Sequence, residues 1–123
     1  MCLDTINPKI RNRFKFDKKG RVIAFQRIIK RNDGYTPCYC DQYDKRVFLK
    51  GKRYAAKQKD VMYFNIDVYY KSGFHGVSSI DTYRLPDDVW VEVRLSGKLT
   101  FGQDSGRVVC VGEYRTIIGE VKC

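Results

Sequence analysis

The sequence predicts a β-rich α+β fold: a single domain over 1–123 with a mainly antiparallel sheet and one or two short helices. Short runs rich in β-branched and aromatic residues are separated by turn signals that contain Gly, Asn or Asp. Good helix formers gather only in brief stretches. The 43% hydrophobic and 14% aromatic content supplies enough apolar side chains for a core.

The first half contains one clear strand and several weaker elements. Residues 1–20 are expected to form an irregular basic segment, with a turn signal at Asn7-Pro8. RVIAFQRIIK, residues 21–30, is typical of a strand, and Asp33-Gly34 predicts a hairpin turn after it. Residues 38–50 predict a second strand, continuous or broken. Residues 51–60 contain good helix formers but span barely two turns, so they predict a helix or an extended basic loop.

The second half predicts an antiparallel meander. In residues 61–70 every second residue is apolar or aromatic, and the polar residues all occupy the positions between them, as in a half-buried strand. Residues 71–79 are expected to form a glycine-bounded loop, and 79–86 one or two helical turns that begin at Ser79 and stop at Pro86. Residues 88–97 alternate regularly and predict a strand, followed by turns at 96–98 and 102–106 and by one or two closing strands over 107–121.

The charge of the chain is strongly asymmetric. The net charge is +10, and residues 1–60 hold 17 Lys and Arg against 6 Asp and Glu, whereas residues 61–123 hold 7 against 8. Such an excess in one half indicates an anionic partner, such as a nucleotide signal, a nucleic acid or an acidic protein surface. The alternative is a solvated basic face that only aids solubility.

Basic and aromatic residues interleave in two segments, 11–21 and 45–59. Cations neutralise phosphates and aromatic faces stack on bases, so this pattern favours a ligand-binding surface. The alternative is that the aromatic residues face inward and the cations face water. The candidate ligand-binding residues are Arg11, Arg13, Lys45, Arg46, Lys52 and Arg53 for charge, and Tyr54, Tyr69 and His75 for stacking or hydrogen bonding.

His75 is the only histidine of the chain. It could bind a phosphate or act as the general base of a small enzyme that acts on a nucleotide or nucleic acid. Asp67 and Asp81 could orient it only if the fold brought them close. The structural alternative is an imidazole that holds a loop by bonding a backbone carbonyl.

The five cysteines, at 2, 38, 40, 110 and 123, are expected to be free thiols, because their number is odd and no secretion signal precedes them. The Cys38-Tyr39-Cys40 motif is a weak zinc signal without further ligands at zinc spacing. Cys2, exposed by removal of Met1, would resemble an N-terminal nucleophile, although no oxyanion hole is visible. We therefore expect no metal and no cofactor.

Three features together resemble a group of small, mostly uncharacterised proteins of bacteriophages and prophages. They are the Met1-Cys2-Leu3 start, the central Gly73-Phe74-His75 triplet, and the Val89–Val93 strand followed by a terminal strand pair. The resemblance implies a phage accessory protein, a class in which inhibitors of host defence are common. It implies no catalytic mechanism.

These observations favour a phage-type counter-defence or regulatory protein that binds an anionic ligand or a host defence protein without catalysis. A small enzyme with His75 as base and an oligomeric virion protein are the alternatives. No apolar run approaches the ~18 residues of a membrane span and no signal peptide is visible, so we expect the protein in the cytoplasm of a bacterial host.

Overall fold

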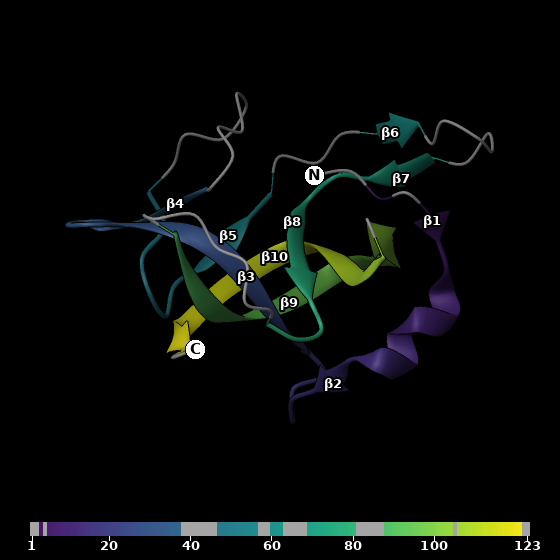
Figure 1. Cartoon of the computed structure of the whole chain (residues 1–123), viewed down its shortest axis with the longest axis horizontal. Coiled ribbons are helices and arrows are strands. Elements are labelled where there is room, and N and C mark those ends of the chain that lie inside the picture. The colour runs from purple at the N-terminus through teal and green to yellow at the C-terminus, as the bar shows by residue number, and fades with distance from the viewer. Residues whose placement is uncertain are drawn as a thin grey trace.

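The computed structural model describes residues 3, 5–37, 47–56, 60–62, 69–80, 88–104 and 106–121. Strands dominate this part of the chain (Figure 1), and a single 3-10 helix, η1, is its one helical element. In chain order the elements are β1 (Thr5–Ile6), η1 (Pro8–Arg13), β2 (Lys15–Phe16), β3 (Val22–Arg31), β4 (Gly34–Pro37), β5 (Arg53–Ala55), β6 (Asp60–Met62), β7 (Tyr69–Lys71), β8 (Phe74–Val77), β9 (Asp88–Asp104) and β10 (Arg107–Val121).

Four strands close into a small barrel. Strand β9 pairs with β3 on one side and with β10 on the other, and β10 pairs in turn with β8. Strand β8 returns to β3 through the pair Phe25 and Val77, which completes the ring. All these pairings are antiparallel (Figure 1). Of the remaining strands, β1 pairs with β9, β2 and β4 pair with β3, and β5 pairs with β10.

The β9–β10 hairpin is the longest strand pairing of the fold. Its register runs from Asp104 opposite Arg107 to Trp90 opposite Val121, so the chain reverses at the second predicted turn. The first predicted turn, at 96–98, is wrong because β9 continues through it. Gly97 has φ +77 and lies where the register shifts around Glu113, whose Oε1 accepts from the Lys98 amide at 3.1 Å. The glycine therefore serves a β-bulge rather than a chain reversal.

The barrel interior holds the main apolar core. Its buried members come from all four ring strands and include Ala24, Val93, Leu95, Cys110 and Ile117. A Cβ added at Gly76 would lie 2.7 Å from the Ala24 Cβ, so β8 approaches β3 closely only because this residue has no side chain.

Residues outside the ring strands also contribute to the core, and the outer face is covered as well. Ile10 and Phe14 of the η1 segment pack into the interior core. A second buried cluster, Leu3, Val77, Trp90, Val109 and Val111, lies on the outer face. Alternate residues of β10 belong to the two clusters, which explains why the run from Val108 to Val111 is apolar without interruption.

The β-rich, mainly antiparallel character is confirmed, as are the strands predicted over 21–30 and 88–97 and the β3–β4 hairpin. The α component is much smaller than expected: η1 lies in the segment predicted to be irregular, and residues 53–55 are extended rather than helical. The helical turns predicted over 79–86 lie largely outside the described residues, as does most of the strand predicted over 38–50.

Two further predictions are wrong. The expected loop at 71–79 contains strand β8, four residues long and paired with β10. The expected single strand at 61–70 is not continuous, because β6 and β7 pair antiparallel with Met62 opposite Tyr69. No helix in the described ranges is long and apolar enough to span a bilayer.

Candidate anion-binding surface

Six exposed cations lie close together on η1, β2 and the turn that follows. We call them the basic strip: Lys9, Arg11, Arg13, Lys15, Lys18 and Lys19. The strip runs along one side of the barrel, at the lower right of Figure 1, away from β4 and β5. Among the described residues, no side chain of the strip other than that of Arg11 has a hydrogen bond, ion pair or ring contact. Five of the six cations are therefore free to meet a partner.

The local sequence explains why these side chains point outward. The Asn7 side chain accepts a hydrogen bond from the Lys9 amide at 3.1 Å, and Pro8 follows at the first helical position. Ile10 and Phe14 then turn into the core, each about 6% exposed. Because these two apolar residues anchor the segment, the intervening basic residues remain in solvent.

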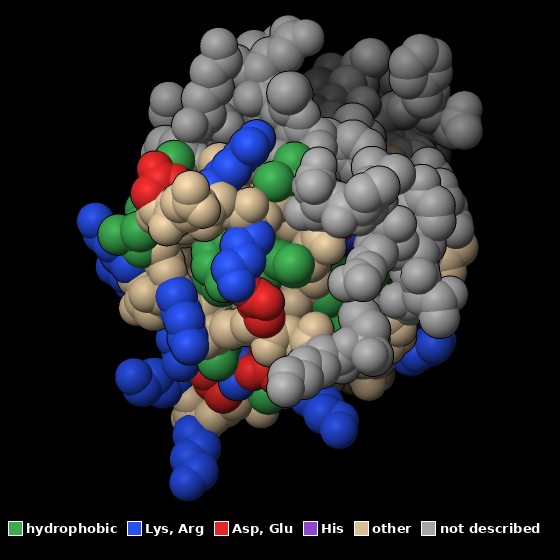
Figure 2. All heavy atoms as spheres, turned by 60° about the vertical axis from the view of Figure 1, so that its left-hand side comes forward, with side chains coloured by type: hydrophobic (Ala, Val, Ile, Leu, Met, Phe, Trp, Pro, Cys, Tyr) green, Lys and Arg blue, Asp and Glu red, His purple; other side chains and the backbone are tan. Residues whose placement is uncertain are grey.

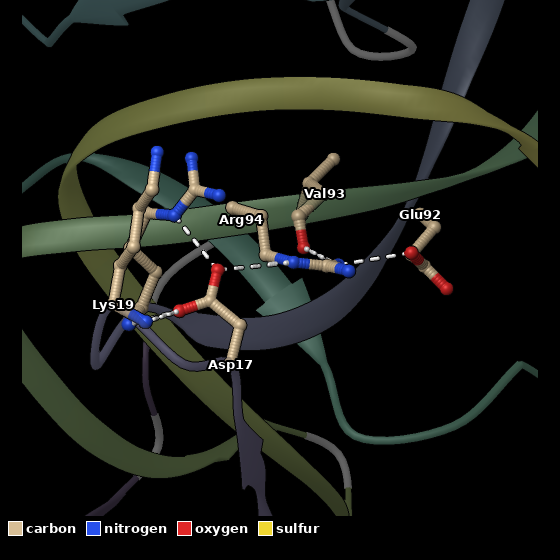
Figure 3. A network of polar contacts seen from close by, with 6 residues as sticks. Asp17, Lys19, Glu92, Val93 and Arg94 are labelled. Atoms are coloured by element: carbon tan, nitrogen blue, oxygen red, sulfur yellow. Dashed lines mark hydrogen bonds and ion pairs between the residues drawn. The ribbon is translucent and has the colours of Figure 1, made fainter.

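Asp17 is the only acidic residue between Thr5 and Asn32. Its Oδ2 lies 2.8 Å from Arg21 Nε and 3.5 Å from Arg94 Nε, and its Oδ1 accepts from the Lys19 and Arg21 amides, each at 2.9 Å (Figure 3). Arg94 also pairs with Glu92 at 2.9 Å. The carboxylate thus faces two arginines outside the basic strip, and its charge does little to offset the strip.

The pKa of Asp17 reflects the same contacts. Burial acts to raise the pKa of this carboxyl, but hydrogen bonds from Arg21 and from the Lys19 amide, together with the Arg21 charge, lower it below its usual value. The group is therefore an anion at neutral pH, and it orders the turn that carries Lys18 and Lys19.

The aromatic residues of this segment face the protein. The Arg11 guanidinium lies 4.5 Å from the centre of the Phe16 ring and 5.8 Å from that of Phe101. Phe14 packs against Phe101 with ring centres 5.6 Å apart. The inward-facing alternative thus holds for Phe14, and the Phe16 face is covered by the strip's own arginine.

The predicted residues Lys52, Arg53 and Tyr54 lie elsewhere, at the start of β5, and have structural contacts. Lys52 Nζ is 5.4 Å from the Tyr54 ring centre, and the Arg53 guanidinium is 4.7 Å from that of Tyr114. The Tyr54 hydroxyl accepts from the Leu49 amide at 2.9 Å, and its ring meets Phe48 edge-on. Tyr54 is therefore held by contacts with its neighbours.

Figure 1 places β5 and η1 on different sides of the barrel, so Arg11 and Arg13 lie on a different surface from Lys52 and Arg53. Figure 2 turns the β4 side forward and shows Lys and Arg side chains interspersed with acidic and hydrophobic ones. In β4, the Tyr35 hydroxyl donates to the Glu120 carboxylate at 3.2 Å, and Lys30 Nζ of the paired strand β3 lies 2.8 Å from the same carboxylate. Positive charge on this side is partly neutralised.

His75 lies in β8 opposite Val111, and alternation along the strand places it on the outer face with Val77. It is half-buried. Of the other candidates, Lys45 and Arg46 lie outside the described residues, as do Asp67 and Asp81. The backbone of Tyr69 is in β7, and its side chain is not described.

Cys110 is a free thiol inside the barrel, where burial raises its pKa to about 12 against the opposing effect of the Arg11 charge. It is thus a packing residue in its protonated form. The remaining four cysteines lie outside the described residues. Within the described part of the chain, no group of three or more His, Cys, Asp or Glu side chains could hold a metal ion.

No protein-family profile, curated protein or solved structure matches this chain.

Sequence reasoning found Arg11 and Arg13 but did not single out Lys9, Lys15, Lys18 and Lys19 as ligand-binding candidates. The sequence pattern that could have identified these lysines is the close spacing of six cations with a single carboxylate among them. The pairing of Asp17 with Arg94 of β9 could not be seen, because it depends on the packing of residues 15–21 against the barrel.

Proposed function

We propose that this chain is a binding protein without catalysis that engages an anionic partner through the basic strip. One observation carries the proposal: six exposed cations lie within residues 9–19, while the one carboxylate among them faces Arg21 and Arg94. Uncompensated charges of one sign create a local potential that attracts anions and raises the rate of association.

The order of the strip also supports binding. Its segment is capped by Asn7, anchored by Ile10 and Phe14, and held at its far end by Asp17. A binding surface that is ordered before it meets its partner loses less conformational entropy on association.

The resemblance in the Met1-Cys2-Leu3 start and the Gly73-Phe74-His75 triplet supports a phage accessory role, in counter-defence or regulation. In such a role the anionic partner would be a nucleotide signal, a nucleic acid, or a host protein with an acidic surface. The proposal requires no catalytic residue.

Fluorescence anisotropy with three labelled anions tests the proposal: a DNA duplex of about 20 base pairs, poly-L-glutamate, and a cyclic dinucleotide. The strip variant K9Q/R13Q/K15Q is compared with the matched control R31Q/K50Q/K98Q, which removes two lysines and one arginine from exposed positions outside the strip.

We expect at least one anion to bind the wild type and the strip variant to weaken that binding by more than about tenfold, with the control within about threefold. If none of the anions binds, or if both variants weaken binding equally, the strip is not a binding surface.

A further inference from the structure

We infer that the anion for the basic strip is duplex nucleic acid, which the strip binds through its phosphates with an affinity that does not depend on base sequence. This inference rests on the proposed function and specifies its partner. It follows from the extent of the strip, from the side chains that the strip lacks, and from the position of its arginine Arg11.

The extent of the strip suits a long anion. A 3-10 helix rises ~2.0 Å per residue and an extended strand ~3.3 Å, so the run from Lys9 to Phe16 spans at most about 20 Å. One strand of a duplex carries a phosphate every ~3.4 Å along the helix axis, or about six over that length. Four of the six cations, Lys9, Arg11, Arg13 and Lys15, lie in this run, and Lys18 and Lys19 follow in the turn beyond it. The positive charge therefore extends along several phosphates of a backbone.

A small nucleotide fits this surface poorly. Mononucleotide sites are concave and bury most of the ligand beneath convergent polar groups. All six cations of the strip are instead exposed, and they lie on the outside of the segment whose Ile10 and Phe14 face the core. Their charges spread along the segment rather than converge on one point.

The strip has few side chains that could read bases. Between Lys9 and Lys19, Asn12 is the only uncharged polar residue. Proteins that hold single strands usually stack bases on exposed aromatic rings. Here Phe14 is buried and the Phe16 face lies under Arg11 at 4.5 Å. Phosphate contacts therefore dominate, and they favour a duplex because its two backbones present more charge per length.

The test measures the fluorescence anisotropy of labelled anions as wild-type protein is added, at salt concentrations from about 50 to 200 mM. The anions are two DNA duplexes of unrelated sequence, one of their single strands, and poly-L-glutamate. We expect both duplexes to bind within about threefold of each other and more tightly than the single strand or the polypeptide. Affinity falls steeply with salt because each phosphate contact releases a counterion.

The strip variant K9Q/R13Q/K15Q should lower the magnitude of the slope of log affinity against log salt by about three, roughly one for each cation removed. The control R31Q/K50Q/K98Q should leave this slope within about one of the wild-type value. Circular dichroism spectra and the single substitution Lys9→Gln, expected to lower the slope by about one, guard against misfolding of the triple variant.

Three results overturn the inference: a preference above about tenfold for one duplex sequence, tighter binding of the single strand, or an unchanged salt slope in the strip variant. If poly-L-glutamate binds the wild type as tightly as the duplex does, and the strip variant no longer binds poly-L-glutamate, the proposed function stands and the nucleic-acid partner is wrong. If no anion binds, both are wrong.

Discussion

The carboxylate of Asp17 lies 3.5 Å from Nε of Arg94, which ties the turn at the end of the basic strip to strand β9 of the barrel (Figure 3). The same oxygen pairs with Arg21 at 2.8 Å. One acidic residue thus links the surface that we assign to binding with the part of the fold that gives the chain its stability.

Asp17→Asn should lower the melting temperature at neutral pH, because Arg21 and Arg94 lose their shared anion. The folded-state pKa of Asp17 is lowered from the usual 3.8, so its contribution to stability is present above that value and is lost as pH falls through the folded-state pKa. Melting curves of both proteins from neutral pH to about pH 2 check this. A difference in melting temperature that persists unchanged to the acid end would contradict the assigned role.

Gly76→Ala should destabilise the protein by about 1–3 kcal/mol, the usual cost of overpacking a core. The new Cβ would lie 2.7 Å from the Ala24 Cβ and 3.1 Å from a Leu95 methyl, so β8 must move away from β3. The matched control is Gly119→Ala, whose Cβ would meet only the flexible end of Lys50 at 3.6 Å. Urea unfolding measures both, and equal effects would show that the barrel does not close where β8 meets β3.

Arg115 is 1% exposed, and its guanidinium lies 4.2 Å from the ring centres of both Phe48 and Phe74 while it donates to Gln26. Arg115→Ala should cost about 3 kcal/mol or more, because it removes these contacts and leaves a cavity. Arg115→Met, which keeps more of the volume, should cost less. Chemical denaturation gives both values, and equal losses for the two variants would mean that the charge and hydrogen bonds matter more than the packing.

His75→Ala should lower the urea midpoint, because His75 is half-buried in β8 opposite Val111. Affinity for the anion should stay within about twofold, because the proposal places binding on the strip rather than on β8. Anisotropy and denaturation of the same preparation separate the two effects. Lost binding in a variant of unchanged stability would instead make His75 a ligand-binding residue.

The strand at 88–97 could be predicted because burial on one face imposes an alternation that the local sequence reveals. The strand at 21–30 could be predicted from its β-branched and aromatic residues. Gly97 and Gly76 misled the prediction, because a glycine needed for a bulge or for close packing looks locally like one needed for a turn. Their roles depend on Glu113 and Ala24, which only the folded sheet brings near.

The candidate site was predictable in charge but not in location. The sequence identified the basic first half, yet it grouped Arg11 and Arg13 with Lys52 and Arg53, which the fold separates onto different sides of the barrel (Figure 1). It also could not show that Arg11 covers Phe16, since cation–π contacts follow from the path of the segment.

The most direct test of the central claim is an amide chemical-shift titration of the isotope-labelled protein with the DNA duplex. We expect the largest shifts to fall within residues 9–19 and their sheet neighbours. Largest shifts at Lys52 and Arg53, or shifts spread evenly over the surface, would contradict the assignment of the basic strip as the binding surface.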